Sequence, residues 1–189
     1  MNPPRLSDES SQEAPVPRID ANGFSIRKCA NTELAEILDV QNEAFSDMPR
    51  GGLLRINTKE MFLECLRAPN ITLGAWFGDR LAAFSILYYP HDEAEDLSVS
   101  LNGVGVKGEK TANYKLCIVR REFRGKSLQY VLGLEKERIA IESGTKLLCA
   151  TVSPDNPHSI DNILRLGFIY NRTLMKYGYE RNLYYKFVG

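Results

Sequence analysis

Residues 116–132 read LCIVRREFRGKSLQYVL, and this stretch decides the fold. An apolar run typical of a strand ends at Val119, a basic segment follows, and an apolar stripe at helical spacing begins near Gly125. Residues 115–126 carry five cations and one acid in a chain whose formal net charge is zero. Free N–H groups at a helix start attract anions, and glycine lets the backbone approach them closely. The order strand, basic loop, helix therefore predicts an anion-binding turn; the alternative is a solvated basic turn.

A second stretch, residues 147–168, reads LLCATVSPDNPHSIDNILRLGF. Its apolar half belongs to a strand predicted over 146–152, and the turn residues after it lead into a helix predicted over 159–166. Gly167 fits the position that follows a helix end. On these features alone the stretch is a strand–turn–helix unit and indicates no particular chemistry.

The rest of the chain continues to alternate between strand and helix patterns. We predict helices over 33–45, 58–67, 125–143 and 159–166, the second capped by Asn57, and strands over 24–27, 71–77, 81–89, 114–119, 146–152, 168–176 and 182–188. This order predicts an α/β fold, a single domain over 23–189 with a mixed, mainly antiparallel sheet and helices on both faces. Residues 1–22 hold four of the nine prolines and show no period, which predicts a flexible N-terminal extension.

Composition argues against several classes of protein. The longest apolar run, 81–89, has nine residues, whereas a membrane helix needs roughly 20. The N-terminus lacks the apolar core of a secretory signal. The four cysteines form no CxxC pair, so we expect no metal site and a reduced, cytoplasmic protein. The zero net charge argues against nucleic acid or a membrane surface as a partner.

Two phosphate-binding patterns are present without the context that they need. Residues 103–108 spell GxGxxG, but no strand pattern precedes them and no helix pattern opens on them. Gly125-Lys126-Ser127 matches the end of a Walker A loop, but Arg120 stands where that loop needs its first glycine. The sequence therefore predicts neither a dinucleotide site nor a P-loop.

The two stretches together resemble the Gcn5-related N-acetyltransferase (GNAT) superfamily. The first is similar to the pyrophosphate loop of that family, Q/R-x-x-G-x-G/A, and here it runs Arg124-Gly125-Lys126-Ser127-Leu128-Gln129. The second is similar to the family's late segment, with Asn156, Ser159 and Leu166-Gly167-Phe168 at the family spacing. The order of elements from residue 24 to residue 188 also matches that of the family.

The resemblance implies a fold with splayed central strands, here 114–119 and 146–152, and acetyl-CoA bound in the split between them. The residues implied as donor-binding fall into three groups. Backbone of Cys117, Ile118 and Val119 would pair with the pantetheine arm; the amides of Arg124, Gly125, Lys126, Ser127, Leu128 and Gln129 would hold the pyrophosphate; and Asn156 and Ser159 would line the arm near the thiol, as the catalytic candidates. A backbone N–H near Ile118 would stabilise the charge that develops on the acetyl oxygen.

The chain departs from the family at three positions. Ser127 and Gln129 stand where the family has glycine or another small residue, and Gln129 could crowd the pyrophosphate. Ile163 stands where the family often has the tyrosine that protonates the departing thiolate. Because a thiol has a pKa of about 8.5, CoA is already an acceptable leaving group, so the loss of the tyrosine weakens catalysis without excluding it.

The predicted function is direct transfer of an acetyl group from acetyl-CoA to a primary amine of a small molecule or a protein. Homodimers are common among such enzymes. Two alternatives stay open: a catalytically weak CoA-binding regulatory module, and an interaction domain whose basic loop, 120–126, binds an acidic partner. We expect Cys117 and Cys149 to pack as small apolar residues and His158 to be a turn residue. The acidic residues of 92–96 are either solvated or attract a cationic amine.

Overall fold

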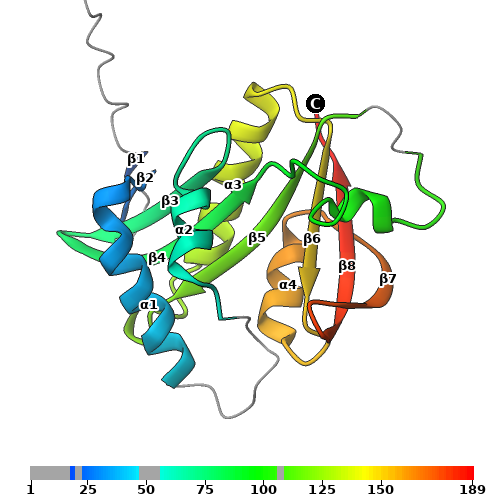
Figure 1. Cartoon of the computed structure of the whole chain (residues 1–189). Coiled ribbons are helices and arrows are strands. Elements are labelled where there is room, and N and C mark those ends of the chain that lie inside the picture. The colour runs from blue at the N-terminus through cyan, green and yellow to red at the C-terminus, as the bar shows by residue number, and fades with distance from the viewer. Residues whose placement is uncertain (1–17, 20–22, 47–55, 106–108) are drawn as a thin grey trace, which may run out of the picture.

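The computed structural model describes residues 18–19, 23–46, 56–105 and 109–189. In these residues an eight-stranded sheet runs in the order β1-β2-β3-β4-β5-β6-β8-β7 (Figure 1). Its strands are β1 (Arg18–Ile19), β2 (Ser25–Lys28), β3 (Ile71–Phe77), β4 (Arg80–Tyr88), β5 (Thr111–Val119), β6 (Leu147–Val152), β7 (Ile169–Lys176) and β8 (Tyr179–Phe187). The β5–β6 pair is parallel, and every other neighbouring pair is antiparallel.

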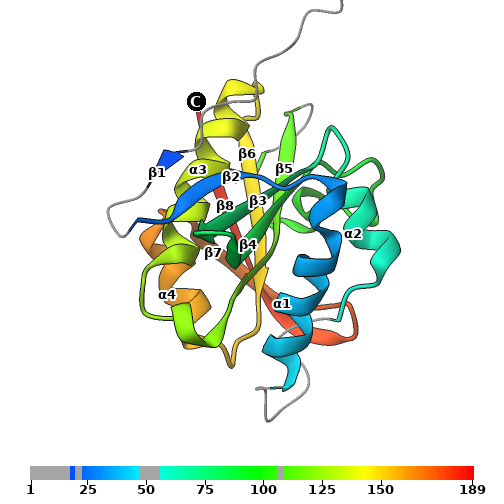
Figure 2. The same cartoon turned by 90° about the vertical axis from the view of Figure 1, so that its left-hand side faces the viewer.

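Helices cover both faces of this sheet. On one side lie α1 (Leu34–Ser46) and α2 (Lys59–Cys65), and on the other lie α3 (Leu128–Glu142) and α4 (Pro157–Arg165) (Figure 2). Ile37 of α1 and Phe62 of α2 pack with Phe84 of β4 in one apolar core. Leu132 of α3 and Ile163 of α4 belong to a second core on the opposite face. The predicted α/β fold, with a mixed sheet between two layers of helices, is confirmed.

The two central strands part in the middle of the sheet. β5 and β6 pair in parallel over four positions, from Thr111 opposite Leu147 to Tyr114 opposite Ala150. Beyond Tyr114, β5 runs on to Val119 against β4 alone. The β4–β5 register shifts at this point, because Ile86 pairs with Leu116 whereas Leu87 pairs with Tyr114. The extra residue is a β-bulge, which bends and twists a strand. The splayed central strands are therefore present.

The start of β5 and the N-terminal cap of α2 differ from the prediction, and each involves a polar side chain. β5 begins at Thr111, three residues before its predicted start, and Asn113 in this added segment donates from its Nδ2 to the carbonyl of Glu95. The cap of α2 is Thr58, whose hydroxyl accepts from the amide of Met61 at 3.3 Å. The prediction that Asn57 caps α2 was wrong. The backbone amide of Asn57 donates to the side chain of Gln41.

Part of the predicted extension, 1–22, joins the sheet. Arg18 and Ile19 form the two-residue strand β1 opposite Ile26 and Ser25 of β2. The other residues of the extension lie outside the described part of the chain, as do the last three residues of the GxGxxG pattern at 103–108, so the domain boundary stays a prediction. Within the described residues, none of the helices has the length and apolar composition that crossing a bilayer requires.

Tyr114 holds the vertex of the split and provides a test of this geometry. Its hydroxyl donates to the carbonyl of Gly133 in α3 at 2.7 Å, and the side chain is 6% exposed. We expect Tyr114→Phe to lower the free energy of unfolding by about 1 kcal/mol, because a buried hydrogen bond is lost. The measurement is urea denaturation. Tyr170→Phe is the control, because the Tyr170 hydroxyl bonds Thr173 at the surface. Equal losses in the two variants would contradict the assignment.

Candidate functional site

The split between β5 and β6 opens into a cleft of about 890 Å³ that reaches both faces of the sheet. Ten of the residues predicted to bind the donor line it: Cys117, Ile118, Val119, Arg124, Gly125, Ser127, Leu128, Gln129, Asn156 and Ser159. Lys126, the other residue of that set, is exposed and lies outside the lining. The fold thus brings the two sequence stretches to one cavity, although they are separated by the whole of α3.

A tight turn leads from β5 into α3. Arg121–Phe123 forms one turn of 3₁₀ helix, and Gly125 and Ser127 then adopt positive φ of 76° and 59°. The helix begins at Leu128, three residues later than predicted, because the left-handed conformation of Ser127 interrupts it. A left-handed backbone conformation favours glycine, and in this chain Ser127 adopts it. The hydroxyl of Ser127 does not cap the helix, so it leaves the amides of the first turn without a side-chain acceptor at this position.

Gln129 connects this turn to α4. Its Nε2 donates to the hydroxyl of Ser159 at 3.4 Å, and its Oε1 accepts from the side chain of Asn162 at 3.5 Å. Both bonds are long, which makes them weak. The side chain that could crowd a pyrophosphate is thus directed across the cleft to the helix that carries the second motif.

Asn156 and Ser159 shape the start of α4. The Oδ1 of Asn156 accepts from the amide of Ser159 at 3.1 Å, so Asn156 is the helix cap and α4 begins at Pro157, two residues before its predicted start. Ile163 lies one turn further along, 6% exposed, and contributes an apolar wall to the cleft. His158 is exposed within the first turn of α4, where its carbonyl accepts from Asn162. The catalytic role of Asn156 and Ser159 stays a prediction.

The comparisons with known proteins rest on structure. No family model and no curated protein matches the sequence. The ribosomal-protein-alanine N-acetyltransferase of Brucella melitensis is 18% identical, with a TM-score of 0.65 over 86% of this chain and 99% of that chain. A GNAT-family acetyltransferase of Streptococcus pneumoniae is 16% identical, with a TM-score of 0.66 over 88% and 99% of the two chains.

The chain has the GNAT fold. The structure of yncA from Salmonella typhimurium, 15% identical with a TM-score of 0.65 over 87% of this chain and 93% of that chain, was solved with its cofactor acetyl-CoA. This chain therefore carries its split strands, its turn at 124–129 and its late helix on a GNAT fold.

One cation of the basic loop is used to hold the fold of this chain together. Arg120 is 6% exposed, and its guanidinium bonds the carboxylates of Asp39, at 2.6 Å, and Glu43, at 2.5 Å. Its Nε donates to the carbonyl of Leu81 at 2.8 Å. Arg120 therefore joins the end of β5 to α1 and is not available to a ligand. The sequence count of five cations overstated the charge at the anion site.

Lys136, which the sequence analysis did not single out, lies inside the cleft. It is 3% exposed, and its Nζ lies 3.6 Å from the ring centroid of Tyr114. Among the described residues it forms no ion pair with a carboxylate. Burial lowers the pKa of Lys136 to about 7, and the neighbouring Cys117 opposes this shift. A sequence pattern could not identify it, because a lysine on a mostly apolar helix stripe usually extends to the surface.

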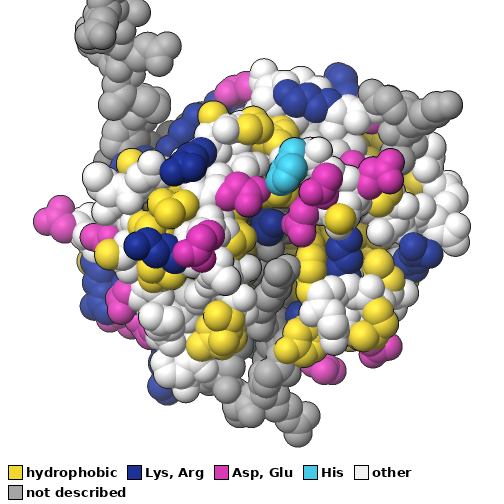
Figure 3. All heavy atoms as spheres, in the orientation of Figure 1, with side chains coloured by type: hydrophobic (Ala, Val, Ile, Leu, Met, Phe, Trp, Pro, Cys, Tyr) yellow, Lys and Arg dark blue, Asp and Glu magenta, His cyan; other side chains and the backbone are white. Residues whose placement is uncertain are grey.

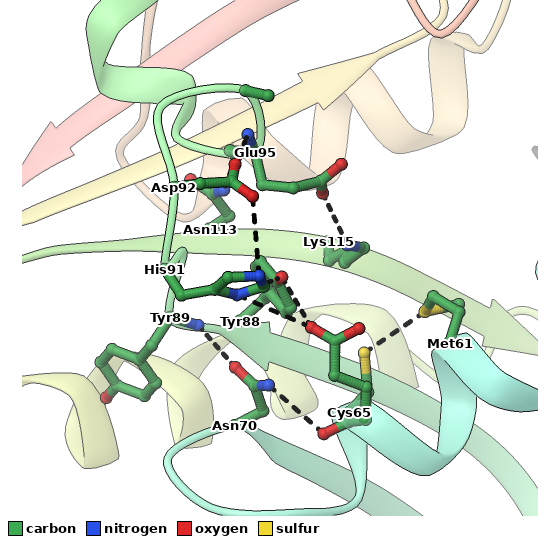
Figure 4. Close-up of polar contacts among 12 residues, drawn as sticks. Met61, Cys65, Asn70, Tyr88, Tyr89, His91, Asp92, Glu95, Asn113 and Lys115 are labelled. Atoms are coloured by element: carbon green, nitrogen blue, oxygen red, sulfur yellow. Dashed lines mark hydrogen bonds and ion pairs between the residues drawn. The ribbon is translucent and has the colours of Figure 1, made fainter.

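The opposite mouth of the cleft carries charged and polar groups from β5 and from the loop that joins β4 to β5. The Nζ of Lys115 lies 2.8 Å from Oε2 of Glu95, and the Nδ2 of Asn113 donates to the backbone carbonyl of Glu95 at 2.7 Å (Figure 4). The Oδ1 of Asn113 is buried and has no hydrogen-bond partner among the described residues. Acidic side chains gather around a histidine on this face (Figure 3). The predicted acidic stretch, 92–96, thus reaches the cleft through Glu95, whose charge Lys115 compensates.

The cysteines near the cleft are poorly suited to covalent chemistry. Burial raises the pKa of the Cys149 thiol to about 12 and also raises that of Cys117. Cys149 is fully buried in a small apolar cluster with Leu97 and Leu183. Because a thiolate and not a thiol is the nucleophile, neither residue is activated. The expectation that Cys149 packs as a small apolar residue is confirmed.

The buried charge of Lys136 predicts a pH dependence of stability. Its pKa is lower in the folded chain than the usual value of about 10.4, so the unfolded chain binds more protons between pH 7 and 10. The free energy of unfolding should therefore gain a contribution as pH rises through this window, and lose it as pH falls to 7. We expect Lys136→Met to be more stable than the wild type at pH 7, by on the order of 2 kcal/mol, with a difference that shrinks towards pH 10.

The measurement is chemical denaturation at several pH values. Lys126→Met is the matched control, because the exposed Lys126 has no buried charge to relieve. A difference between Lys136→Met and the wild type that is constant from pH 7 to 10 would contradict the buried, desolvated ammonium.

Proposed function

We propose that this chain transfers an acetyl group from acetyl-CoA directly to a primary amine. The observation that carries the proposal is the split: β5 continues for five residues past its last pair with β6 and ends at the turn into α3. In a strand, alternate backbone groups point to opposite neighbours, so the departure of β6 leaves unpaired groups along this edge of β5. A pantetheine arm, with its two amides, can add to that edge as a further strand.

The two ends of the cleft suit the two ends of the donor. The amides of the first turn of α3, the helix dipole and Arg124 favour a pyrophosphate at the turn 124–129. The apolar walls of Cys117 and Val119 favour the arm. The acetyl group would then lie along the open part of β5, between the turn and the vertex, where a backbone N–H near Ile118 is the proposed donor to the developing oxyanion.

The chemical step is an aminolysis of the thioester. The amine nitrogen bonds the acetyl carbon, the carbon–sulfur bond breaks, and the sulfur leaves with the electron pair. An amine of pKa about 10.4 is protonated at neutral pH, so it must first lose a proton to water or to a base. The attacking nitrogen loses a second proton as the amide forms, and the departing thiolate takes up one proton at the end of the step. Because Ile163 has no proton to give, that proton comes from another group or from water.

The interaction-domain alternative has less support than the transferase. It needs the cations of the loop 120–126 at the surface; Arg121, Arg124 and Lys126 are exposed, but Arg120 is withdrawn from this surface by its ion pairs with α1. The alternative of a regulatory CoA-binding module is supported by Ile163, which stands where the family often has the tyrosine that protonates the thiolate. It differs from the proposal in one result, which is that acetyl-CoA binds and no amine is acetylated.

Donor binding is tested by thermal shift with acetyl-CoA, CoA, ATP and inorganic pyrophosphate. A ligand at 100 times its Kd stabilises by about 2.7 kcal/mol, which is on the order of 5–10 °C for a chain of this size. We expect that shift with acetyl-CoA and CoA, and a much smaller one with ATP or pyrophosphate. Arg124→Gln should weaken acetyl-CoA binding about tenfold, because a phosphate contact is lost.

Arg172→Gln is the control for Arg124→Gln, because Arg172 is exposed on β7 and does not line the cleft. No shift with millimolar acetyl-CoA, or equal shifts with every polyanion, would overturn the donor assignment.

Direct transfer predicts sequential kinetics. Both substrates must be bound before either product leaves, and no acetylated enzyme accumulates, because the thiols of Cys117 and Cys149 stay protonated. Initial rates with both substrates varied, and mass spectrometry of the enzyme after incubation with acetyl-CoA alone, make the test. Ping-pong kinetics together with a stable acetyl adduct on either cysteine would contradict direct transfer.

A further inference from the structure

A second buried cation, Arg181 of β8, lines the cleft. It is 6% exposed. Its contacts are a long hydrogen bond from Nη1 to the carbonyl of Glu180, at 3.4 Å, and the ring of Tyr179, 5.2 Å from the guanidinium carbon. No carboxylate among the described residues pairs with it. Arg120, equally buried, has two such carboxylates, so burial of an arginine in this chain does not by itself prevent pairing with a carboxylate.

The sheet places Arg181 across the split from β5. The β6–β8 ladder ends where Val152 pairs with Asn182. Arg181, which precedes Asn182 in β8, lies just beyond the end of this ladder. Side chains alternate along a strand, so Arg181 lies on the same face as Leu183, which packs with Leu97. Tyr184 packs into the opposite core, with α3 and α4. Arg181 therefore faces the side of the sheet away from the turn 124–129.

Among the described residues, no carboxylate compensates the charge of Arg181 on this side. A guanidinium cannot release its proton in a protein, so burial leaves a positive charge that water can barely reach. Burial lowers the pKa of Arg181, and the groups that oppose the shift are Tyr179 and Tyr177, not a carboxylate. The nearby Lys115–Glu95 pair is neutral as a unit. Asp155 and Asp161 also line the cleft, but they belong to the β6–α4 turn and to α4, and neither forms an ion pair with Arg181.

We propose that Arg181 binds a carboxylate of the acceptor, so that the acceptor is an amine that also carries a carboxylate, as an amino acid does. The inference rests on the proposed function, because it takes the donor to occupy the α3 side of the split. A carboxylate accepts two parallel N–H bonds from a guanidinium, which supplies both the missing charge and the missing hydrogen bonds. The orphaned Oδ1 of Asn113 is a further acceptor, without a partner among the described residues, on the same face of the cleft.

The test uses matched pairs of probes that differ in the carboxylate alone. Tyrosine and tyramine, histidine and histamine, and ornithine and putrescine are titrated by calorimetry into the protein saturated with CoA, and their acetylation is followed by thiol release from acetyl-CoA. We expect the carboxylate member of at least one pair to bind and react at least tenfold better than its decarboxylated partner. Arg181→Gln should abolish that preference by raising the KM of the carboxylate member at least tenfold.

Two variants and one separate measurement keep the test decisive. Arg181→Lys retains the charge and loses the paired geometry, so it should keep part of the preference; Arg172→Gln, on the exposed part of β7, should keep all of it. Acetyl-CoA affinity should be unchanged in all three. If acetyl-CoA binds but no carboxylate probe does, or if the decarboxylated members do as well, the Arg181 proposal is overturned and the donor site stands. If acetyl-CoA does not bind the wild type, the proposed function fails first.

Discussion

The early end of the β5–β6 ladder is the constraint on which the rest of the molecule depends. Four parallel pairs bring the strands together, and the pairing stops at Tyr114 and Ala150. Each end of the free part of β5 is held by a side chain. The Tyr114 hydroxyl bonds α3 at the vertex, and Arg120 bonds α1 beyond Val119. The sheet can therefore keep an open edge in its centre, where a continuous ladder would have satisfied every backbone group.

The cleft made by this split contains two buried cations on opposite faces of the sheet. Lys136 lies on the α3 side against Tyr114, and Arg181 lies on the other side near the Lys115–Glu95 pair. Burying a charge without a carboxylate costs stability. The fold pairs Arg120 with two carboxylates but leaves Lys136 and Arg181 without one among the described residues, and both of these cations line the same cleft. A ligand that carries complementary groups would offset the free-energy cost of burying these two charges.

Much of the architecture could be predicted from sequence, because apolar periodicity and turn residues are local signals. The strands at 71–77, the basic turn and the α4 segment were all found in this way. Side-chain partners were not. The cap at Thr58, the burial of Arg120 against Asp39 and Glu43, and the left-handed Ser127 depend on contacts or backbone angles that no spacing encodes. Lys136 and Arg181 were missed for the same reason, since a lone cation in a strand or helix is usually at the surface.

The most direct measurement is residue-resolved amide hydrogen exchange with and without acetyl-CoA. The account predicts that amides on the open edge of β5, within Cys117–Val119, and amides of the 124–129 turn slow their exchange when the donor binds, because the arm and the pyrophosphate supply their missing acceptors. Amides of β7, remote from the cleft, should not change. Saturating acetyl-CoA that protects β7 or the surface loops, and leaves β5 and the turn unprotected, would contradict the claim that the split in the sheet is the donor site.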